Sequence, residues 1–197
     1  VIREILANPE AYGRSEYGRD EKVMVEFVSA NPTGPMHMGN ARGGALGDCL
    51  AAVLDKAGYN AWREFYVNDA GNQIEKFGCS LEARYLQIFK GDEIEFPEDG
   101  YHGDDIKELA KLFCEKYGDD WLKLDTPERH KMMAEFGLSI NLPKMKRDLA
   151  RYGIEYDQWF LESSLHASGY VADSVQKLTD AGFTYEKLSL IHISEPT

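Results

Sequence analysis

The stretch from residue 22 to residue 67 changes its hydrophobic period twice, and this change restricts the fold more than any other feature. Lys22–Ser29 (KVMVEFVS) is a short apolar run with β-branched residues, which is typical of a buried strand. Two prolines and a glycine interrupt regular structure at residues 31–35. Apolar side chains then recur at helical spacing: Leu46, Cys49, Leu50, Val53, Leu54 and Ala57. Asn60–Val67 (NAWREFYV) follows as a second strand, so the order predicts a βαβ unit, a parallel sheet and an α/β fold.

The remainder of the chain is predicted to be mainly helical. Helices are expected at residues 74–89, 104–117, 127–152 and 172–181, and a third strand at 154–160. Residues 91–152 are interpreted as an acidic, helical insertion. Of the net charge of −12, residues 91–120 contribute −8, with 3 basic and 11 acidic side chains. This imbalance indicates a solvated segment and weakens, without excluding, a nucleic-acid-binding function.

Composition excludes several other classes of protein. No apolar run approaches the roughly 20 residues that span a bilayer, and the first residues do not form a signal peptide. The three cysteines, Cys49, Cys79 and Cys114, are widely spaced, which argues against a disulfide framework and a zinc site. We therefore expect a cytoplasmic protein with reduced thiols, no membrane contact and no bound metal or prosthetic group. The absence of an initiator Met suggests a chain that begins inside a longer one.

The last ten residues are interpreted separately. Leu188–Thr197 (LSLIHISEPT) matches the translation of a common sequencing adapter over its full length. We expect these residues to be non-native and the protein's own sequence to cover residues 1–187. The alternative is a native strand in which Leu188, Leu190 and His192 alternate.

The loop between the first strand and its helix carries the residues best suited to chemistry. It ends in Pro35–Asn40 (PMHMGN), at the carboxyl end of a strand and the beginning of a helix, where ligands bind in open α/β sheets. The helix N-terminus favours an anion, and Gly39 allows close approach of a ligand. His37 and Asn40 can donate hydrogen bonds to oxygens that gain charge during phosphoryl displacement. By itself, this four-residue pattern is a weak signal.

Three longer blocks resemble the arginyl-tRNA synthetases of bacteria, which are class I aminoacyl-tRNA synthetases. They are Val25–Gly43 (VEFVSANPTGPMHMGNARG), Glu64–Gln73 (EFYVNDAGNQ) and Tyr156–Ser163 (YDQWFLES). Their order and spacing match the family, and His37–Asn40 lies at the position of the class I HIGH motif. The resemblance implies the first half of a Rossmann-like nucleotide-binding domain with a helical insertion, so residues 1–187 are expected to be a partial catalytic domain.

The resemblance also implies individual roles. His37 and Asn40 would contact the ATP phosphates and stabilise the transition state, and Gly39 would pack under the adenine. Glu26 and Asn31 would hold the arginine substrate, with Asn31 near its α-amino and carboxyl end. Glu162 would approach the guanidinium, which a carboxylate can bind through two hydrogen bonds. One position departs from the family: the last residue of the motif is usually His and here is Asn40.

Simpler interpretations of the same carboxylates remain open. Glu26 lies within an apolar strand, where it could instead pair with Arg42 or Arg63. Glu162 could be a helix N-cap or an ordinary surface residue.

Two further segments allow more than one reading. Asp69 and Asn72 could line the substrate pocket or serve only as turn and capping residues. Lys144–Arg147 (KMKR) resembles the second class I motif, KMSK, but lies inside a helical pattern and lacks its serine. We interpret this segment as a solvated helix face.

The implied reaction is activation of L-arginine by ATP, with Mg²⁺, to arginyl-adenylate, followed by transfer to tRNA(Arg). The full-length enzyme is expected to be a monomer. The 197-residue chain is expected to be inactive alone, because the KMSK-like loop and the anticodon-binding domain are not in it. Two alternatives are a small nucleotidyltransferase with a His-x-Gly-His loop and a synthetase-like module that binds RNA or protein.

Overall fold

A computed structural model describes residues 1–187 and 190–193 of the chain. It divides into two compact units, Val1–Phe160 and Leu161–Thr197. The first unit contains the predicted βαβ element and the predicted helical block, and it begins with a short exposed helix, α1 (Ile2–Ala7).

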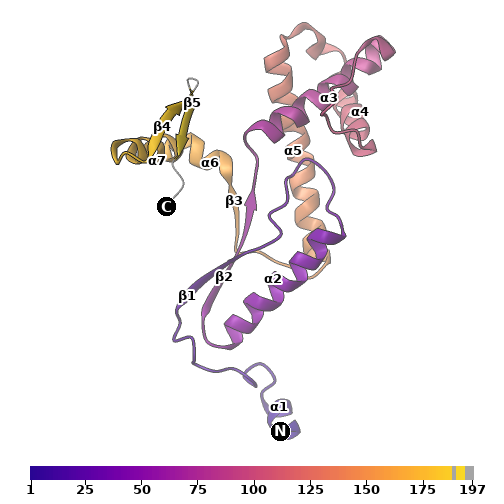
Figure 1. Ribbon diagram of the computed structural model, residues 1–197. Coiled ribbons are helices and arrows are strands. Elements are labelled where there is room, and N and C mark those ends of the chain that lie inside the picture. The colour runs from indigo at the N-terminus through magenta and orange to yellow at the C-terminus, as the bar shows by residue number, and fades with distance from the viewer. Residues whose placement is uncertain (188–189, 194–197) are drawn as a thin grey trace. The chain divides into compact units, whose positions relative to one another are not determined.

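The βαβ prediction is confirmed. Strands β1 (Lys22–Glu26) and β2 (Asn60–Val67) pair in parallel, with Val25 opposite Arg63, and helix α2 (Met38–Lys56) connects them (Figure 1). Strand β3 (Gln158–Leu161) completes the sheet in the order β1-β2-β3. The fold class is therefore α/β with parallel strands, as the sequence predicts.

The first strand, which the sequence predicts to be a buried strand, is buried on one face only. Val25 and Phe27 point into the core, whereas Lys22, Met24 and Glu26 are exposed. The regular structure also ends at Glu26, three residues before the end of the apolar run. Only one face of the strand is covered, because α2 and the end of a later helix, α5 (Thr126–Arg151), pack on the side to which Val25 and Phe27 point.

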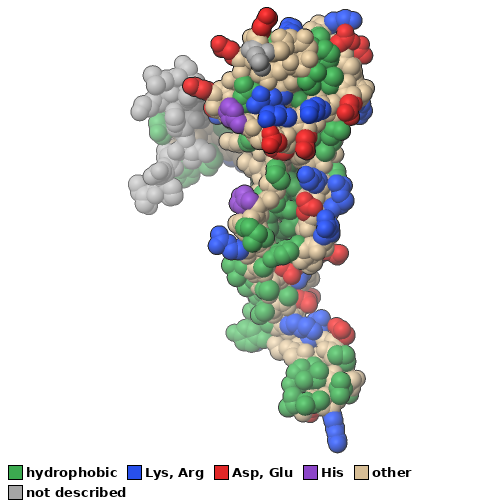
Figure 2. Space-filling view, turned by 90° about the vertical axis from the view of Figure 1, so that its right-hand side faces the viewer, with side chains coloured by type: hydrophobic (Ala, Val, Ile, Leu, Met, Phe, Trp, Pro, Cys, Tyr) green, Lys and Arg blue, Asp and Glu red, His purple; other side chains and the backbone are tan. Residues whose placement is uncertain are grey.

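Helix α2 packs against the sheet through its smallest residues. Gly44, Gly47 and Ala51 are buried, whereas Leu46 and Val53 are 74% and 65% exposed. A Cβ at Gly47 would lie 2.2 Å from Cγ of Phe27, so the helix approaches the strand more closely than any larger residue allows. Of the apolar stripe that predicts the helix, Leu54 packs against the core, whereas Leu46, Leu50 and Val53 are exposed. Figure 2 shows hydrophobic side chains gathered on the surface below the charged helical block.

The helical block comprises α3 (Asn72–Lys90), α4 (Asp104–Tyr117) and α5 (Thr126–Arg151), with the short 3₁₀ turns η1 (Gly91–Glu93) and η2 (Asp120–Lys123). Their predicted positions are confirmed to within two residues. The three helices share one core, which includes Phe77, Ile106 and Met133, so α3 packs together with the helices of the segment 91–152.

Helix α5 joins the two cores of the first unit. Its first half packs in the helical block through Met133 and Ala134, and its second half packs on the sheet through Met145 and Leu149 (Figure 1). The KMSK-like segment lies in this second half. Its Lys and Arg side chains are exposed, which confirms the solvated helix face, whereas Met145 belongs to the core.

The second unit contains α6 (Glu162–Ala167), α7 (Tyr170–Asp180), β4 (Thr184–Lys187) and β5 (Leu190–Ile193). The last predicted helix is confirmed as α7, and β4 and β5 pair as an antiparallel hairpin. The expectation of a non-native end falls partly on residues 188–189 and 194–197, which lie outside the described residues; the backbone of Leu190–Ile193 forms β5.

No helix in the described part of the chain combines the length and the apolar character needed to cross a membrane.

Candidate functional site

The loop between β1 and α2 leaves the strand through an unusual backbone conformation. Val28 and Ser29 have φ angles of +68° and +42°, in the left-handed region that β-branched residues such as Val rarely adopt. Each such residue costs on the order of 1–3 kcal/mol and persists only where its surroundings hold it. The Oγ of Ser29 accepts a hydrogen bond of 3.1 Å from the N–H of Tyr66 in β2, which ties this turn to the neighbouring strand.

Helix α5 holds the middle of the same loop. The side-chain amide of Asn141, which is buried, donates a hydrogen bond of 3.0 Å to the carbonyl oxygen of Pro32. At the start of the loop, the hydroxyl of Tyr156 donates to the carbonyl oxygen of Phe27 at 3.1 Å. Burial, together with the charge of Asp48, raises the pKa of Tyr156, so its hydroxyl stays protonated and remains a donor. The loop is therefore attached to the strand, the long helix and the segment before β3.

His37 and Asn40 form a reciprocal cap at the beginning of α2. The N–H of His37 donates to Oδ1 of Asn40 at 3.0 Å, and the N–H of Gly39 donates to Nδ1 of His37 at 3.1 Å. Because Nδ1 accepts, the proton of the neutral imidazole lies on Nε2, which can donate to a ligand. Because Oδ1 of Asn40 is used in the cap, its NH₂ group can also donate to a ligand.

Gly39 has a structural reason to lack a side chain. A Cβ at this position would lie 2.9 Å from Cε1 and 3.0 Å from Nδ1 of His37. A side chain at position 39 would therefore require the exposed imidazole of His37 to shift from its place over the first turn of α2. This explanation is independent of any contact between Gly39 and a nucleotide.

A pocket of about 570 Å³ lies beside this capped helix end. The β1–α2 loop and the segment that enters α4 line it from two sides. Its polar lining residues are Ser29, Asn31, Thr33, His37, Asn40, Tyr101, His102 and Asp105. Main-chain and side-chain donors and the positive end of the α2 dipole favour an anionic ligand group on the loop side of this pocket.

Some of the other predicted site residues lie away from this pocket. Asn31 lines it, whereas Glu26 is exposed at the end of β1, opposite Glu64, and is not among its lining residues. Arg63 forms an ion pair with Asp48, with Nε 3.4 Å from Oδ1, and not the predicted alternative pair with Glu26.

Asp69, Asn72 and Glu162 lie elsewhere. Asp69 lines a second pocket, between α3 and α5, and Asn72 is the first residue of α3, for which Gly71 is the N-cap. Glu162 is the first residue of α6 in the second unit, where Leu161 occupies the N-cap position. The N-cap interpretation of Asn72 and of Glu162 is therefore wrong.

The second wall of the pocket was not predicted from the sequence; it consists of Tyr101, His102, Gly103 and Asp105. These residues are more than 60 positions after His37, in a stretch that the sequence indicates only as a polar loop and the start of a helix. The family blocks do not include them, and no local pattern connects them with His37.

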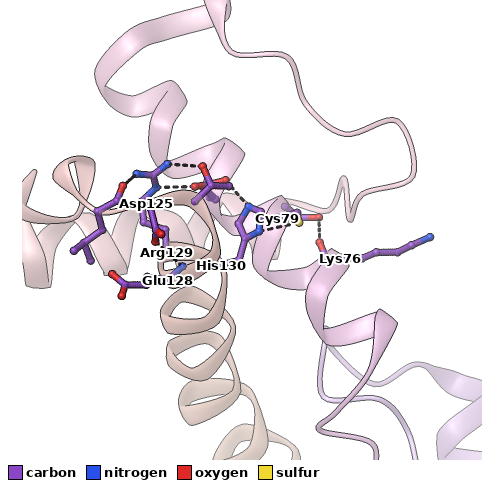
Figure 3. Close-up of polar contacts among 10 residues, drawn as sticks. Lys76, Cys79, Asp125, Glu128, Arg129 and His130 are labelled. Carbon is purple, nitrogen blue, oxygen red and sulfur yellow. Dashed lines mark hydrogen bonds and ion pairs between the residues drawn. The ribbon is translucent and has the colours of Figure 1, made fainter.

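The second pocket, of about 510 Å³, adjoins a buried polar network between α3 and α5 (Figure 3). Glu82 accepts from Nε of Arg129 at 2.6 Å and lies 2.5 Å from Nε2 of His130. The other ring nitrogen of His130 lies 3.5 Å from Sγ of Cys79. Although this resembles the order of a catalytic triad, burial and the charges of Glu82 and Glu75 raise the pKa of Cys79. The thiol is thus not activated as a nucleophile, and the network is best explained as a link between the two helices.

Within the described residues, no group of three or more His, Cys, Asp or Glu side chains is placed to hold a metal ion.

Comparison with known proteins decides the family. The profile of the family "tRNA synthetases class I (R), catalytic domain" matches residues 1–102. The chain belongs to this family of class I synthetases.

Curated relatives agree with this assignment. Arginine–tRNA ligases of Ruminiclostridium cellulolyticum and Acetivibrio thermocellus are 62% and 56% identical to the chain over 188 residues, which is 95% of it. The chain spans about a third (33%) of the length of each.

Solved structures of synthetases have the same fold. A structure described as an arginyl-tRNA synthetase from Campylobacter jejuni aligns with a TM-score of 0.80 and 32% identity, over 96% of this chain and 41% of that one. The arginyl-tRNA synthetase of Plasmodium falciparum aligns with a TM-score of 0.54 and 17% identity, over 96% of this chain and 32% of that one, which shows a shared fold. The α/β sheet, the capped helix and the loop between them are thus those of a class I synthetase catalytic domain.

Proposed function

We propose that the chain is part of an arginine–tRNA ligase, which activates L-arginine with ATP to arginyl-adenylate and pyrophosphate and then esterifies arginine to tRNA(Arg). The observation that carries this proposal is the reciprocal cap of His37 and Asn40, which lines a pocket of about 570 Å³ at the N-terminus of α2. Family membership and the names of the relatives support the choice of arginine and tRNA.

In this proposal, His37 and Asn40 act through hydrogen bonds. Nε2–H of His37 and the NH₂ group of Asn40 donate to oxygens of the ATP phosphates, which gain charge as the α-phosphate is attacked by the arginine carboxylate. Both donors are held in place by the cap before the ligand binds, so little reorganisation accompanies the reaction. Asn40 takes the position usually held by His, and the amide supplies the donor without a formal charge.

The remaining proposed contacts concern arginine and the base. Asn31, which lines the pocket, binds the α-amino and carboxyl end of arginine, while Glu26 and Glu162 are proposed for its remaining contacts, Glu162 at the guanidinium. Gly39 packs under the adenine. Asp69 and Asn72 are proposed as further residues of the substrate pocket.

Several properties of the whole protein belong to the same proposal. Mg²⁺ enters with ATP as part of the substrate. The full-length enzyme is proposed to act as a cytoplasmic monomer. Residues 1–187 are proposed to be its own sequence, with residues 188–197 non-native, and the 197-residue chain is proposed to be inactive alone.

Aminoacylation of tRNA(Arg) by the full-length protein that contains this chain tests the proposal. We expect charging with arginine and not with lysine. His37→Ala should lower kcat by about 10²–10³, the effect of removing one donor to a developing charge. His166→Ala, which removes an exposed histidine from α6, is the matched control and should leave kcat unchanged. Charging with lysine, or equal activity of the two histidine variants, would contradict the proposal.

A further inference from the structure

The pocket beside His37 has a charge distribution that phosphate binding alone does not explain. Of the described residues that line it, Asp105 is the one carboxylate, and none is Lys or Arg. The loop side offers donors to an anion, whereas the opposite wall presents a negative charge. Such a wall would repel a phosphate and favours a cationic group.

The carboxylate of Asp105 lies close to two glycines, Gly34 and Gly103. A Cβ at Gly34 would be 3.4 Å from Oδ2 of Asp105, and a Cβ at Gly103 would be 2.1 Å from its Oδ1. Gly103 has a φ of −60° and a ψ of 158°, which any residue can adopt. The backbone conformation therefore does not require glycine at position 103. A side chain there would instead overlap the carboxylate of Asp105.

The wall that carries Asp105 is fixed to α3 and to the helical core. The hydroxyl of Tyr101 donates to Oε1 of Gln73 at 2.5 Å, and the N–H of Tyr101 donates to Oγ of Ser80 at 2.9 Å. Ile106, the residue after Asp105, is completely buried in the core of the block. Asp105 is thus held at the pocket from both sides along the chain.

Asp105 also differs from the acidic residue next to it. Asp104 is exposed and pairs with Nζ of Lys107 at 2.8 Å. Asp105 is half-buried, and within the part of the chain that the structure describes its carboxylate has no hydrogen-bond or ion-pair partner. Both residues lie in the first turn of α4, so the helix dipole acts on both and does not explain the difference.

We propose that Asp105 binds the α-ammonium group of the amino-acid substrate. This inference rests on the proposed function, in which the pocket activates an amino acid. The reacting carboxylate must meet the α-phosphate beside His37 and Asn40, and the ammonium group is attached to the neighbouring carbon atom. Asp105 lines the same pocket as His37 and Asn40, so in this proposal its carboxylate faces the amino end of the substrate and the acidic segment supplies a binding residue.

Binding measurements on the full-length protein separate the two ends of the ligand. Isothermal titration would compare L-arginine with 5-guanidinopentanoate, which has the guanidinium and the carboxylate but lacks the α-amino group. Asp105→Asn should weaken arginine binding about ten- to a hundredfold, the range for loss of one charge-assisted hydrogen bond. Binding of 5-guanidinopentanoate and of ATP with Mg²⁺ should stay within twofold. Asp104→Asn is the matched control and should change none of the three.

Each other result has a definite meaning. Unchanged arginine binding in Asp105→Asn, or an equal loss for both guanidinium ligands, overturns the inference. A loss confined to ATP with Mg²⁺ also overturns it, since Asp105 would then be a ligand of the metal ion. If the wild type binds a different amino acid, the proposed function is wrong, and the same comparison with the deaminated form of that amino acid still tests Asp105. Absence of amino-acid binding by the wild type overturns both.

Discussion

The contact between Gly47 of α2 and Phe27 gives the most direct test of how the helix and the loop are held together. Gly47→Ala would add a Cβ at 2.2–2.5 Å from Cγ, Cβ and Cδ2 of Phe27. Contacts between carbon atoms are optimal at about 3.5–4.0 Å. Because Cβ and Cγ lie next to the backbone of Phe27, a rotation of the ring cannot relieve the overlap. The helix must instead move away from the strand.

The expected cost follows from two opposing effects. Overpacking of a well-packed core costs about 1–3 kcal/mol, whereas replacing Gly by Ala inside a helix contributes about 0.5–1 kcal/mol of stabilisation. We expect Gly47→Ala to lower the free energy of unfolding by about 1–2 kcal/mol, or Tm by roughly 2–8 °C for a chain of this size. The displaced helix end would also misalign the cap of His37 and Asn40.

Gly43, one turn earlier on the same helix, is the matched control. It is exposed, and a Cβ there would have no atom within 4 Å. Gly43→Ala should therefore raise the free energy of unfolding by about 0.5–1 kcal/mol. Urea unfolding of the two variants and the wild type, followed by circular dichroism, measures both effects. If Gly47→Ala were as stable as Gly43→Ala, the close packing of α2 on β1 would be refuted.

Three further predictions concern buried and titrating groups. Glu82→Leu leaves the guanidinium of Arg129 buried without its carboxylate, which should cost about 3–5 kcal/mol in urea unfolding. Adding Arg129→Met should restore most of this loss, and an equal loss in both variants would argue against the buried pair. Burial raises the pKa of Tyr156 above its ordinary 10.0, so the folded protein keeps the phenol proton to higher pH than the unfolded chain does. The contribution of this phenol to the free energy of unfolding is therefore present below about pH 10 and is lost as the pH rises further. Tyr156→Phe should reduce the alkaline fall in unfolding free energy, and an unchanged slope would show that other groups cause it. Because the pKa of Cys79 is raised by burial, iodoacetamide should label exposed Cys49 faster than Cys79 in mass-spectrometric time courses; equal rates would contradict the buried network.

The candidate site could be predicted from the sequence only where it is contiguous. His37, Gly39 and Asn40 lie within four residues, and their cap depends on atoms of the same turn, so this local pattern and the family resemblance of the surrounding block together singled them out. Asp105 comes from a distant acidic segment. Its place beside His37 depends on how α3, α4 and α5 pack, and no local pattern predicts it.

The sequence by itself determined the approximate positions of the long helices α2 to α5 and of the strands β1 and β2, because hydrophobic period, glycines, prolines and caps act between near neighbours. It did not predict the short helices α1 and α6, and it placed the start of the third strand four residues before β3 begins at Gln158. Only the tertiary structure decided which faces those elements bury. The stripe containing Leu46 and Val53 predicts α2, yet the helix packs through Gly44 and Gly47, because the closest approach to Phe27 is possible only where a side chain is absent. An apolar stripe has the same spacing in the sequence whether or not it packs on the sheet. Long-range packing therefore decides which side chains are buried and which residues line the pocket.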